Sequence, residues 1–401
     1  MLTKRIQNFF KVEALSGIVL FIVLLLALFI ANSQLLPLYQ SLVELPIQVR
    51  IGSFNLEKPA FLWVNDGLMA IFFMLLAMEI KREVLEGDLS DASQMALPII
   101  AAIGGIAIPA LIYVALNYQG ELTIIGWPIP TMTDIAFTLG VIALLGSRVP
   151  PNLKVFVVAL SIVDDILAIG IIAIFYTGQL SYLALLFALI GILTLIAFNF
   201  LGIKRIAPYL LLGIVIWVCV LQSKVHATLA GVIIGLLIPL HTKEAGSTTS
   251  YSPLRRLEHM LHPWVAFFIL PIFVFFNGGI SFENFSWSSL LHPVPIGIAM
   301  GLFLGKSVGI FSISWLVIKL GFAKLPSGSN WWQFYGVSTL TGIGFTMSLF
   351  LSALAFSGTE YEDLARKGVL FGSLLSMAWG VLIIWFSNHA PTHPHSIFSK
   401  S

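Results

Sequence analysis

The sequence predicts an all-α integral membrane protein with twelve transmembrane helices. Of its 401 residues, 58% are hydrophobic and only 10% are charged, and its mean hydropathy is +0.97, whereas soluble domains are much more polar. Apolar runs close to the length that crosses a bilayer recur along the chain, and in lipid such a run satisfies its backbone hydrogen bonds as a helix. The runs are too long and too continuous for the strands of an outer-membrane barrel.

The twelve expected spans form one membrane domain that covers residues 1–401. An even number of spans places both termini on the same side of the membrane. Most of the 21 lysine and arginine residues fall in loops on that side, so the positive-inside rule predicts that both termini are cytoplasmic. From hydropathy and periodicity we expect the spans at residues 14–32, 60–86, 96–117, 122–146, 151–176, 182–201, 206–222, 225–240, 254–277, 294–320, 333–357 and 362–387.

The composition argues against several kinds of site. The single cysteine, Cys219, lies in an apolar span, so the sequence excludes an intrachain disulfide and a thiolate metal cluster. The net charge of +2 is spread along the chain without a basic block, so we expect no nucleic-acid partner. We also expect no cofactor.

A short exported β-hairpin is expected between the first two spans, at residues 45–58. Apolar and polar residues alternate from Ile47 to Leu56 on both sides of Gly52-Ser53, a pattern typical of two strands around a tight turn. The edge of such a hairpin can pair with a second copy of the chain, which suggests a homodimer. The alternative is an ordinary irregular loop.

The fourth and eleventh expected spans contain residues that interrupt a helix. In the fourth, Gly126 to Asp134 includes two prolines and an acid, and each proline removes a backbone donor where water cannot replace it. In the eleventh, Thr341 to Met347 contains two glycines. Residues 134–140 and 342–348 share Ile, Phe and Thr in register. Interruptions at corresponding places in two halves of a chain point to the binding site of an inverted-repeat transporter.

Six ionisable residues lie deep within the expected spans, where each is costly to place at the bilayer centre. This cost favours a functional role for them. The alternative is a set of buried, hydrogen-bonded groups that serve helix packing, and it is stronger for Asp66 and His226, which lie near the expected membrane edges. The six residues are Asp66, Asp134, Asp164, Asp165, His226 and Lys306.

Asp164 and Asp165 are consecutive on one helix, so their side chains point about 100° apart. We therefore expect one to line a water cavity while the other meets a neighbouring helix. Na⁺ is a hard cation that prefers oxygen ligands, and carboxylates clustered in a low dielectric take up protons more readily than exposed ones. One site can then bind either ion, and this competition provides a mechanism of exchange.

Lys306 lies in the middle of the tenth expected span. It belongs to the pattern Gly-x-x-x-Gly-Lys-x-x-Gly that begins at Gly301, whose small residues allow another helix to approach closely. A buried ammonium group needs a nearby carboxylate, and either Asp164 or Asp165 can provide it. Asp134 and Lys306 could also offset the dipoles of half-helices that meet at the interruptions. The alternative for Lys306 is a side chain that reaches the membrane interface.

Two charged clusters lie toward the cytoplasmic ends of the second and ninth spans. Histidine titrates near neutrality, and i, i+3 spacing keeps two rings on one helix face, so these clusters could sense pH. The alternative is a pair of solvated helix ends with surface ion pairs. The sequence gives even less support for a zinc site, because no further zinc ligands accompany the two histidines. The clusters are Glu79, Arg82 and Glu83, and Glu258, His259 and His262.

Five strings of this sequence resemble the NhaA Na⁺/H⁺ antiporters, and together they cover nearly the whole chain in order. NhaA is itself one of the transporter folds from which the inverted-repeat rule is drawn. The resemblance implies that spans 3–5 and 10–12 are inverted repeats, that spans 4 and 11 are discontinuous, and that the protein lies in the bacterial inner membrane. The strings are Trp127-Pro-Ile-Pro-Thr-Met-Thr-Asp-Ile-Ala-Phe137, Ile162-Val-Asp-Asp165, Val225-His-Ala-Thr-Leu-Ala-Gly231, Glu258-His-Met-Leu-His-Pro-Trp264 and Thr341-Gly-Ile-Gly-Phe-Thr-Met-Ser348.

The resemblance also implies roles for individual residues. Asp164 and Asp165 are the implied ion-binding pair, and Lys306 is the implied charge partner of Asp164. Asp134 and Thr133 are implied at the crossing of the two discontinuous helices. The implied activity is pH-regulated, electrogenic exchange of Na⁺ or Li⁺ for H⁺ in contact with membrane lipid, with pH sensing by the two charged clusters and dimerisation through the hairpin.

The sequence departs from the family pattern at Ser307, where we expect proline in relatives. Lys306, the implied charge partner, is unaffected by this difference. A kink that depends on proline is not expected here.

Two other classes of membrane protein use similar residues. Intramembrane aspartyl proteases place two aspartates on neighbouring helices, but this chain lacks their G-x-G-D string. A retinal-type pump would use Lys306 as its Schiff-base lysine with an aspartate counter-ion, and the twelve expected spans argue against it.

Overall fold

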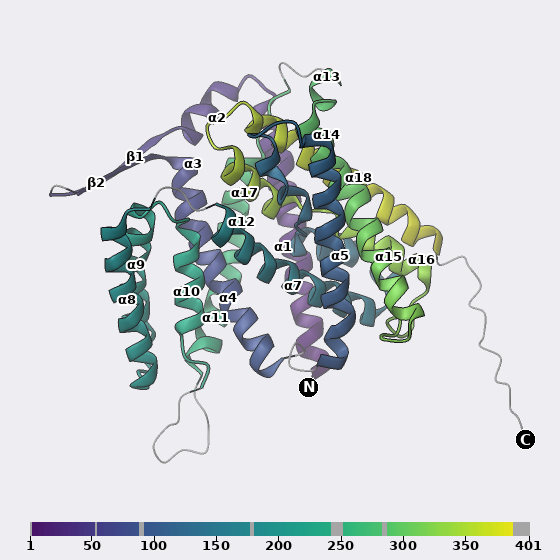
Figure 1. Cartoon of the computed structure of the whole chain (residues 1–401), viewed down its shortest axis with the longest axis horizontal. Helices are drawn as coiled ribbons and strands as arrows, with labels where there is room; N and C mark the ends of the chain where they lie inside the picture. The colour runs from purple at the N-terminus through teal and green to yellow at the C-terminus, as the bar shows by residue number, and fades with distance from the viewer. Residues whose placement is uncertain are drawn as a thin grey trace, which may run out of the picture.

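Most of the chain forms long helices that run between two ends of the molecule (Figure 1). The computed structural model describes residues 2–52, 54–87, 92–176, 180–241, 252–282 and 287–387. The elements up to residue 200 are α1 (Leu2–Ala31), α2 (Leu36–Val43), β1 (Pro46–Ile51), β2 (Phe54–Pro59), α3 (Ala60–Trp63), α4 (Met69–Glu86), α5 (Ala92–Asn117), α6 (Ile135–Leu145), α7 (Pro151–Phe175) and α8 (Tyr182–Phe200). Those that follow are α9 (Ile206–Gln222), α10 (Thr228–Leu237), α11 (Pro253–Trp264), α12 (Leu270–Gly278), α13 (Trp287–Leu290), α14 (Pro293–Met300), α15 (Lys306–Lys319), α16 (Trp331–Leu340), α17 (Phe345–Phe356) and α18 (Tyr361–Ser387).

Ten stretches of the described residues are long and apolar enough to cross a membrane, by length and composition. The other two expected spans correspond to α9 and α10, which are apolar but shorter. α10 has 10 residues and rises only about 15 Å, roughly half of a bilayer's hydrocarbon core. The chain is thus a multi-pass membrane protein, and the count of twelve spans stays a prediction. The ten stretches are Val12–Ala31, Ala60–Glu86, Met95–Asn117, Ile124–Arg148, Pro151–Phe175, Tyr182–Phe200, Pro253–Gly278, Pro293–Lys319, Trp331–Phe356 and Tyr361–Ser387.

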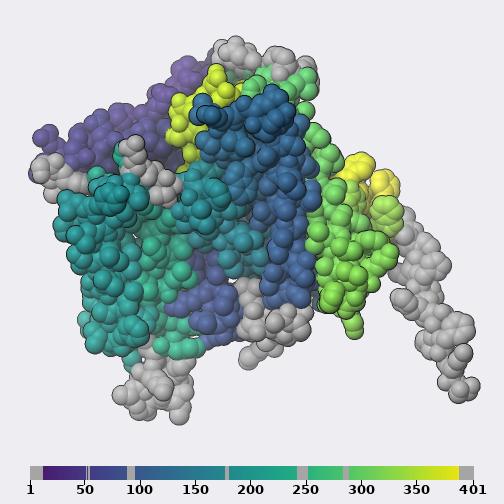
Figure 2. All heavy atoms as spheres, viewed as in Figure 1, coloured from purple at the N-terminus to yellow at the C-terminus, as the bar shows by residue number. Residues whose placement is uncertain are grey.

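Helices from distant parts of the sequence pack against each other. α5 packs along α14 and α15, α4 along α10, and α1 along α6. α8 and α9 pair with each other on the left side of the molecule, below the hairpin in Figures 1 and 2. α5, dark blue in Figure 2, runs down the middle of the face shown there. The functional groups described below lie on the central helices rather than on the α8–α9 pair.

The expected β-hairpin is confirmed. β1 and β2 pair antiparallel, beginning with Pro46 opposite Pro59. At the turn, Gly52 has a φ of 59°, a left-handed conformation that glycine adopts without strain, while Ser53 lies outside the described residues. The hairpin projects from the body of the molecule, at the end opposite the beginning of α1 (Figure 1).

In two of the ten stretches, turns or extended backbone separate the helical segments. Between residues 124 and 134, short 3-10 turns are followed by extended backbone before α6 begins. Pro128 and Pro130 lie in this segment, and neither has an N–H group to continue a helix. The second segment, residues 341–344, separates α16 from α17. The 3-10 turns are Ile124–Gly126 and Ile129–Thr131, and a further one, Gly146–Arg148, follows α6.

Three π-helical turns interrupt other stretches, and the sequence did not predict them. One of them ends at Gly305, directly before Lys306. The Ser307 hydroxyl donates to the Phe303 carbonyl oxygen at 2.6 Å in the same region. Since a π turn locally changes helix geometry, the helix is irregular beside Lys306 without a proline. The π turns are Val64–Leu68, Val265–Ile269 and Gly301–Gly305.

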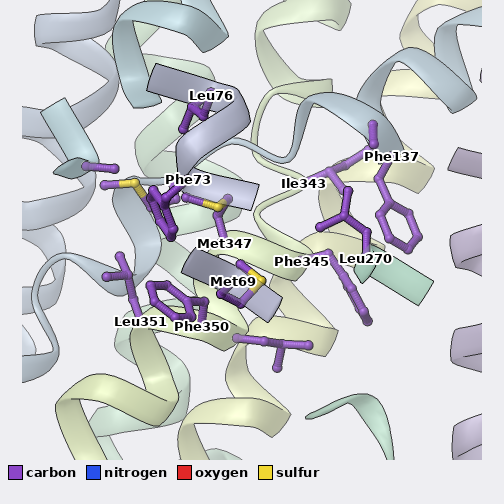
Figure 3. Packing of buried hydrophobic residues seen from close by; sticks show 14 of the residues in the cluster. Met69, Phe73, Leu76, Phe137, Leu270, Ile343, Phe345, Met347, Phe350 and Leu351 are labelled. Atoms are coloured by element: carbon purple, nitrogen blue, oxygen red, sulfur yellow. The ribbon is translucent and has the colours of Figure 1, made fainter. Parts of the chain in front are cut away.

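Apolar side chains pack around the start of α17 (Figure 3). The rings of Phe73 from α4 and Phe350 from α17 have centroids 5.4 Å apart. The ring centroids of Phe137 from α6 and Phe345 are 4.9 Å apart. Because this packing excludes water, unpaired polar groups beside it are costly and need partners within the protein.

Gly309 on α15 allows the close approach of α5 beside Lys306. A Cβ added at Gly309 would lie 2.2 Å from the carbonyl oxygen of Gly104, so one backbone would have to move. We predict that Gly309→Ala lowers the free energy of unfolding by about 1–3 kcal/mol through overpacking, measured by thermal unfolding in detergent. Gly170→Ala is the matched control, because a Cβ there meets nothing within 4 Å. Equal unfolding temperatures for the two variants would contradict the close packing.

Candidate functional site

The Asp134 carboxylate joins the two interrupted stretches. It is the N-cap of α6, where its Oδ1 accepts a hydrogen bond from the Phe137 backbone N–H at 3.1 Å. Its Oδ2 accepts two more from Thr346 in the first turn of α17, from the backbone N–H at 2.8 Å and from the hydroxyl at 2.5 Å. Helix N-termini stabilise a negative charge. One carboxylate therefore caps both half-helices.

The backbones of the two interruptions also satisfy each other. The Asp134 N–H donates to the Ile343 carbonyl oxygen at 2.7 Å. The Thr133 hydroxyl lies 3.0 Å from the Thr341 carbonyl oxygen. Polar groups freed by the broken helices thus find partners without water, as an apolar environment requires.

Asp164 is enclosed by protein and paired with a buried cation. The Lys306 ammonium donates to Asp164 Oδ2 at 2.5 Å, and the exposed fractions of the two side chains are 0% and 1%. The Thr133 hydroxyl lies 2.7 Å from the same oxygen. The other oxygen, Oδ1, has no hydrogen-bond partner among the described residues. The site thus contains a buried ion pair in which one carboxylate oxygen of Asp164 accepts no hydrogen bond from the described residues.

Asp165 lines a cavity of about 340 Å³, which the α11–α12 segment borders together with α1, α4, α6 and α7. Its exposed fraction is 7%, against 0% for Asp164. Consecutive helical residues point about 100° apart, so the two carboxylates face different surroundings. A cation that enters the cavity can reach Asp165, while Asp164 lies deeper in the protein. The charged and polar residues that line the cavity are Glu13, Ser16, Glu79, Arg82, Glu83, Asp165 and His262.

The first charged cluster lies at this cavity and contacts the second one. Arg82 of α4 donates to Glu258 of α11 at 3.0 Å and to Glu83 at 2.5 Å. Glu79, one turn before Glu83 on α4, lines the same cavity. The structure therefore brings residues from both clusters together, through an ion pair between α4 and α11.

The two histidines of the second cluster have different surroundings. His262 lines the cavity, and its Nε2 lies 3.0 Å from Oε1 of Glu13 on α1. His259 is exposed and is not among the residues that line the cavity. The i, i+3 spacing thus does not bring both rings into one site. Sequence reasoning missed Glu13, because an isolated acid at the start of the first span has no partner at helical spacing.

Asp66 and His226 make contacts elsewhere. Asp66 Oδ2 lies 2.7 Å from the Lys58 ammonium, near the hairpin. The Nδ1 of His226 lies 2.7 Å from the Thr228 hydroxyl, and its ring centroid is 5.5 Å from that of Phe350. Neither Asp66 nor His226 is among the cavity-lining residues. These contacts favour a packing role for both.

The comparison with known proteins decides the family. A family profile described as Na⁺/H⁺ antiporter 1 matches residues 7–384. The chain is 51% identical over 386 residues to the Na(+)/H(+) antiporter NhaA of Pseudomonas putida strain GB-1, which covers 96% of this chain and 98% of that protein. This chain belongs to the NhaA family. It is also 52% identical over 381 residues to NhaA of Aeromonas hydrophila, which covers 94% of this chain and 95% of that protein.

Membership in the NhaA family makes the chain a membrane transporter rather than an enzyme. It removes the grounds for the protease and retinal-pump interpretations. The family implies Na⁺ and H⁺ as the transported ions. Such ions prefer carboxylate oxygen atoms, which Asp165, Glu13, Glu79 and Glu83 present at the cavity.

The Lys306–Asp164 pair can be tested through stability. We predict that Lys306→Met lowers the free energy of unfolding by about 3–5 kcal/mol, because it leaves the Asp164 carboxylate as an uncompensated buried charge. Thermal unfolding of the purified protein at neutral pH measures this loss. Adding Asp164→Asn to the same chain should recover part of it.

A lysine at the other end of the same helix provides the control. Lys319 ends α15, with its ammonium group 4.6 Å from the centre of the Trp315 ring. Lys319→Met should cost at most about 1 kcal/mol, the value of an exposed cation–π contact. If Lys306→Met cost no more than Lys319→Met, the buried ion pair would be contradicted.

Proposed function

We propose that this chain exports Na⁺ in exchange for H⁺ by pH-regulated, electrogenic alternating access. The observation that carries the proposal is the pair of neighbouring carboxylates, with Asp165 lining a cavity and Asp164 enclosed beside Lys306. In the membrane interior, such groups are retained at a high energetic cost. Relatives that are about half identical are named Na⁺/H⁺ antiporters, which supports these two ions as the cargo.

Na⁺ and H⁺ compete for the same carboxylate oxygens in the proposed cycle. A carboxylate must be deprotonated to hold a metal ion, and its hard oxygen atoms suit Na⁺ and also Li⁺. Na⁺ enters the cavity from the cytoplasm and binds Asp165 and Asp164. After the site turns to face the opposite side, protons displace the ion. Two carboxylates that take up two protons for each Na⁺ released move one net charge per cycle, so the exchange is electrogenic.

Asp134, Thr133 and Lys306 support the site in this proposal without binding the ion. Asp134 holds the first turns of α6 and α17 together. Thr133 and Lys306 fix the position of Asp164 Oδ2. The two interrupted segments cross at Thr133 and Asp134, and few backbone hydrogen bonds within each segment need to break when it changes conformation. We therefore place the alternating-access movement at this crossing.

Charged residues around the cavity provide the proposed pH regulation. Protonated His262 pairs with Glu13, which couples α11 to α1 at low pH. Rising pH removes the proton and weakens this link. His259 is a weaker candidate because its side chain is exposed. The proposed sensing residues are Glu79, Arg82, Glu83, Glu258, His262 and Glu13, with His259 as the additional candidate.

The proposal also covers the membrane, the orientation and the oligomeric state of the protein. We propose a bacterial inner-membrane protein, surrounded by lipid, with both termini in the cytoplasm and the hairpin in the periplasm. β1 and β2 form a two-stranded sheet, so each strand keeps an outer edge that can pair with a second copy. That geometry supports a homodimer through this hairpin.

The ion-binding residues are tested by transport in proteoliposomes. Addition of Na⁺ or Li⁺ to vesicles with an acid interior should dissipate the proton gradient, followed with a pH-sensitive dye. Asp164→Asn and Asp165→Asn should reduce this signal to that of empty vesicles, because an amide cannot alternate between a metal ion and a proton. Asp363→Asn is the matched control, since the Asp363 side chain is 57% exposed. Wild-type exchange by Asp165→Asn would disprove the assignment.

The pH sensor is tested with the two histidines. His262 faces Glu13 from α1 and Glu79 from α4, with Glu258 on its own helix. We predict that His262→Ala shifts the pH profile of exchange toward lower pH, because the variant lacks the His–Glu13 link that protonation strengthens. The maximal rate should be largely unchanged. His259→Ala is the matched comparison and should shift the profile less than His262→Ala, because the His259 side chain is exposed and does not line the cavity. An unmoved profile for His262→Ala would restore the interpretation as ordinary ion pairs.

A further inference from the structure

Ser161 of α7 carries a fully buried hydroxyl group without a hydrogen-bond partner. Its exposed fraction is 0%, and its Oγ is one of six buried side-chain atoms in the described part of the chain that lack a partner. An unpaired hydroxyl in an apolar interior is costly, and a native protein retains one for a reason, such as a bound ion.

A second unpaired oxygen atom lies one helical turn away. Oδ2 of Asp164 accepts hydrogen bonds from the Lys306 ammonium and the Thr133 hydroxyl. Oδ1 of Asp164 accepts none from the described residues. Asp164 follows Ser161 at i+3, and residues at this spacing are neighbours on a helix surface, with Cβ atoms about 5–6 Å apart. Two buried oxygen atoms on adjacent turns of α7 thus lack partners.

Helix geometry places Ser161 between the two carboxylates. At about 100° per residue, Asp164 lies about 60° to one side of Ser161 and Asp165 about 40° to the other, both one turn further along α7. Of these three residues, Asp165 lines the cavity, whereas Ser161 and Asp164 do not. The three side chains therefore lie within one arc of about 100° on α7, beside the cavity wall.

We propose that the Ser161 hydroxyl oxygen is a direct ligand of the transported Na⁺, together with Asp164 Oδ1 and the Asp165 carboxylate. This inference rests on the exchange function proposed above and adds a neutral ligand to its site. A hydroxyl oxygen offers lone pairs to a hard cation. It has no charge and gains no proton at physiological pH, so it strengthens Na⁺ binding without changing the number of protons exchanged.

The experiment measures the Na⁺ KM of exchange in proteoliposomes at alkaline pH for Ser161→Ala and Ser161→Cys. We expect the KM to rise about 10-fold in both variants, the loss of one polar contact to a charged group, with an unchanged maximal rate at saturating Na⁺. Ser314→Ala is the matched control, because Ser314 on α15 is also fully buried with an unpaired hydroxyl. Its KM should equal that of the wild type.

The cysteine variant separates a ligand from a packing residue. A thiol fills nearly the same space as the hydroxyl, but sulfur is a soft ligand that suits Na⁺ poorly. A ligand role therefore predicts that Ser161→Cys resembles Ser161→Ala, whereas a packing role predicts that it resembles the wild type. Because Ser161→Cys leaves no cavity, it also serves as the test if Ser161→Ala does not fold. A wild-type KM for Ser161→Cys overturns the inference.

Binding can be followed without transport. Na⁺ should raise the thermal unfolding temperature of the purified wild type more than that of Ser161→Cys, since at one Na⁺ concentration the protein that binds the ion more tightly is stabilised more. Equal shifts overturn the ligand role. Failure of the exchange function has a different signature, because the wild type would then transport no Na⁺ or Asp165→Asn would transport it normally.

Discussion

The buried ion pair between Lys306 and Asp164 is the interaction on which the site depends. Neither charge is tolerated alone in a water-free interior, and a pair is retained only when further hydrogen bonds complete it. Thr133 provides one of these bonds at Asp164. α15, which carries Lys306, lies close to α5 where Gly309 and Gly104 meet, and α5 also packs against α7, which carries Asp164. The packing of distant helices is therefore a condition for placing one charge beside the other.

The interrupted helices must also pair their polar groups within the protein, because no water is present in the membrane interior. A broken helix exposes unpaired N–H and C=O groups, which lipid cannot satisfy. The Asp134 carboxylate caps α6 and α17 together, and its backbone N–H pairs with the Ile343 carbonyl oxygen. The crossing thus puts polar groups, rather than a continuous apolar surface, beside Asp164. In the proposed cycle, this arrangement lets an ion exchange partners deep in the protein while the flanking helices stay intact.

Much of the site could be predicted from the sequence, because charges and prolines in apolar spans are conspicuous. Asp134 and Pro130 marked an interruption, and the alternation around Gly52 marked the hairpin. From the residues alone, the partner of Lys306 remained open between Asp164 and Asp165; the resemblance to NhaA favoured Asp164, and the contacts are with Asp164.

Other features depend on packing that spacing does not encode. His259 and His262 share a helical face by spacing, yet only His262 lines the cavity, because α1 brings Glu13 to it. The π turn before Lys306 has no sequence pattern of its own. Ser161 is an ordinary serine in an apolar span, and its unpaired hydroxyl becomes visible only when its neighbours are known.

Competition between Na⁺ and H⁺ for the same carboxylates is tested most directly by proton release. Na⁺ is added to the purified protein in a weakly buffered solution, and the change in pH is recorded together with the heat of binding. If the carboxylates hold either ion, Na⁺ binding should release protons, and the apparent affinity should fall as the starting pH is lowered. Na⁺ binding of equal strength at acid and alkaline pH, without proton release, would contradict the mechanism.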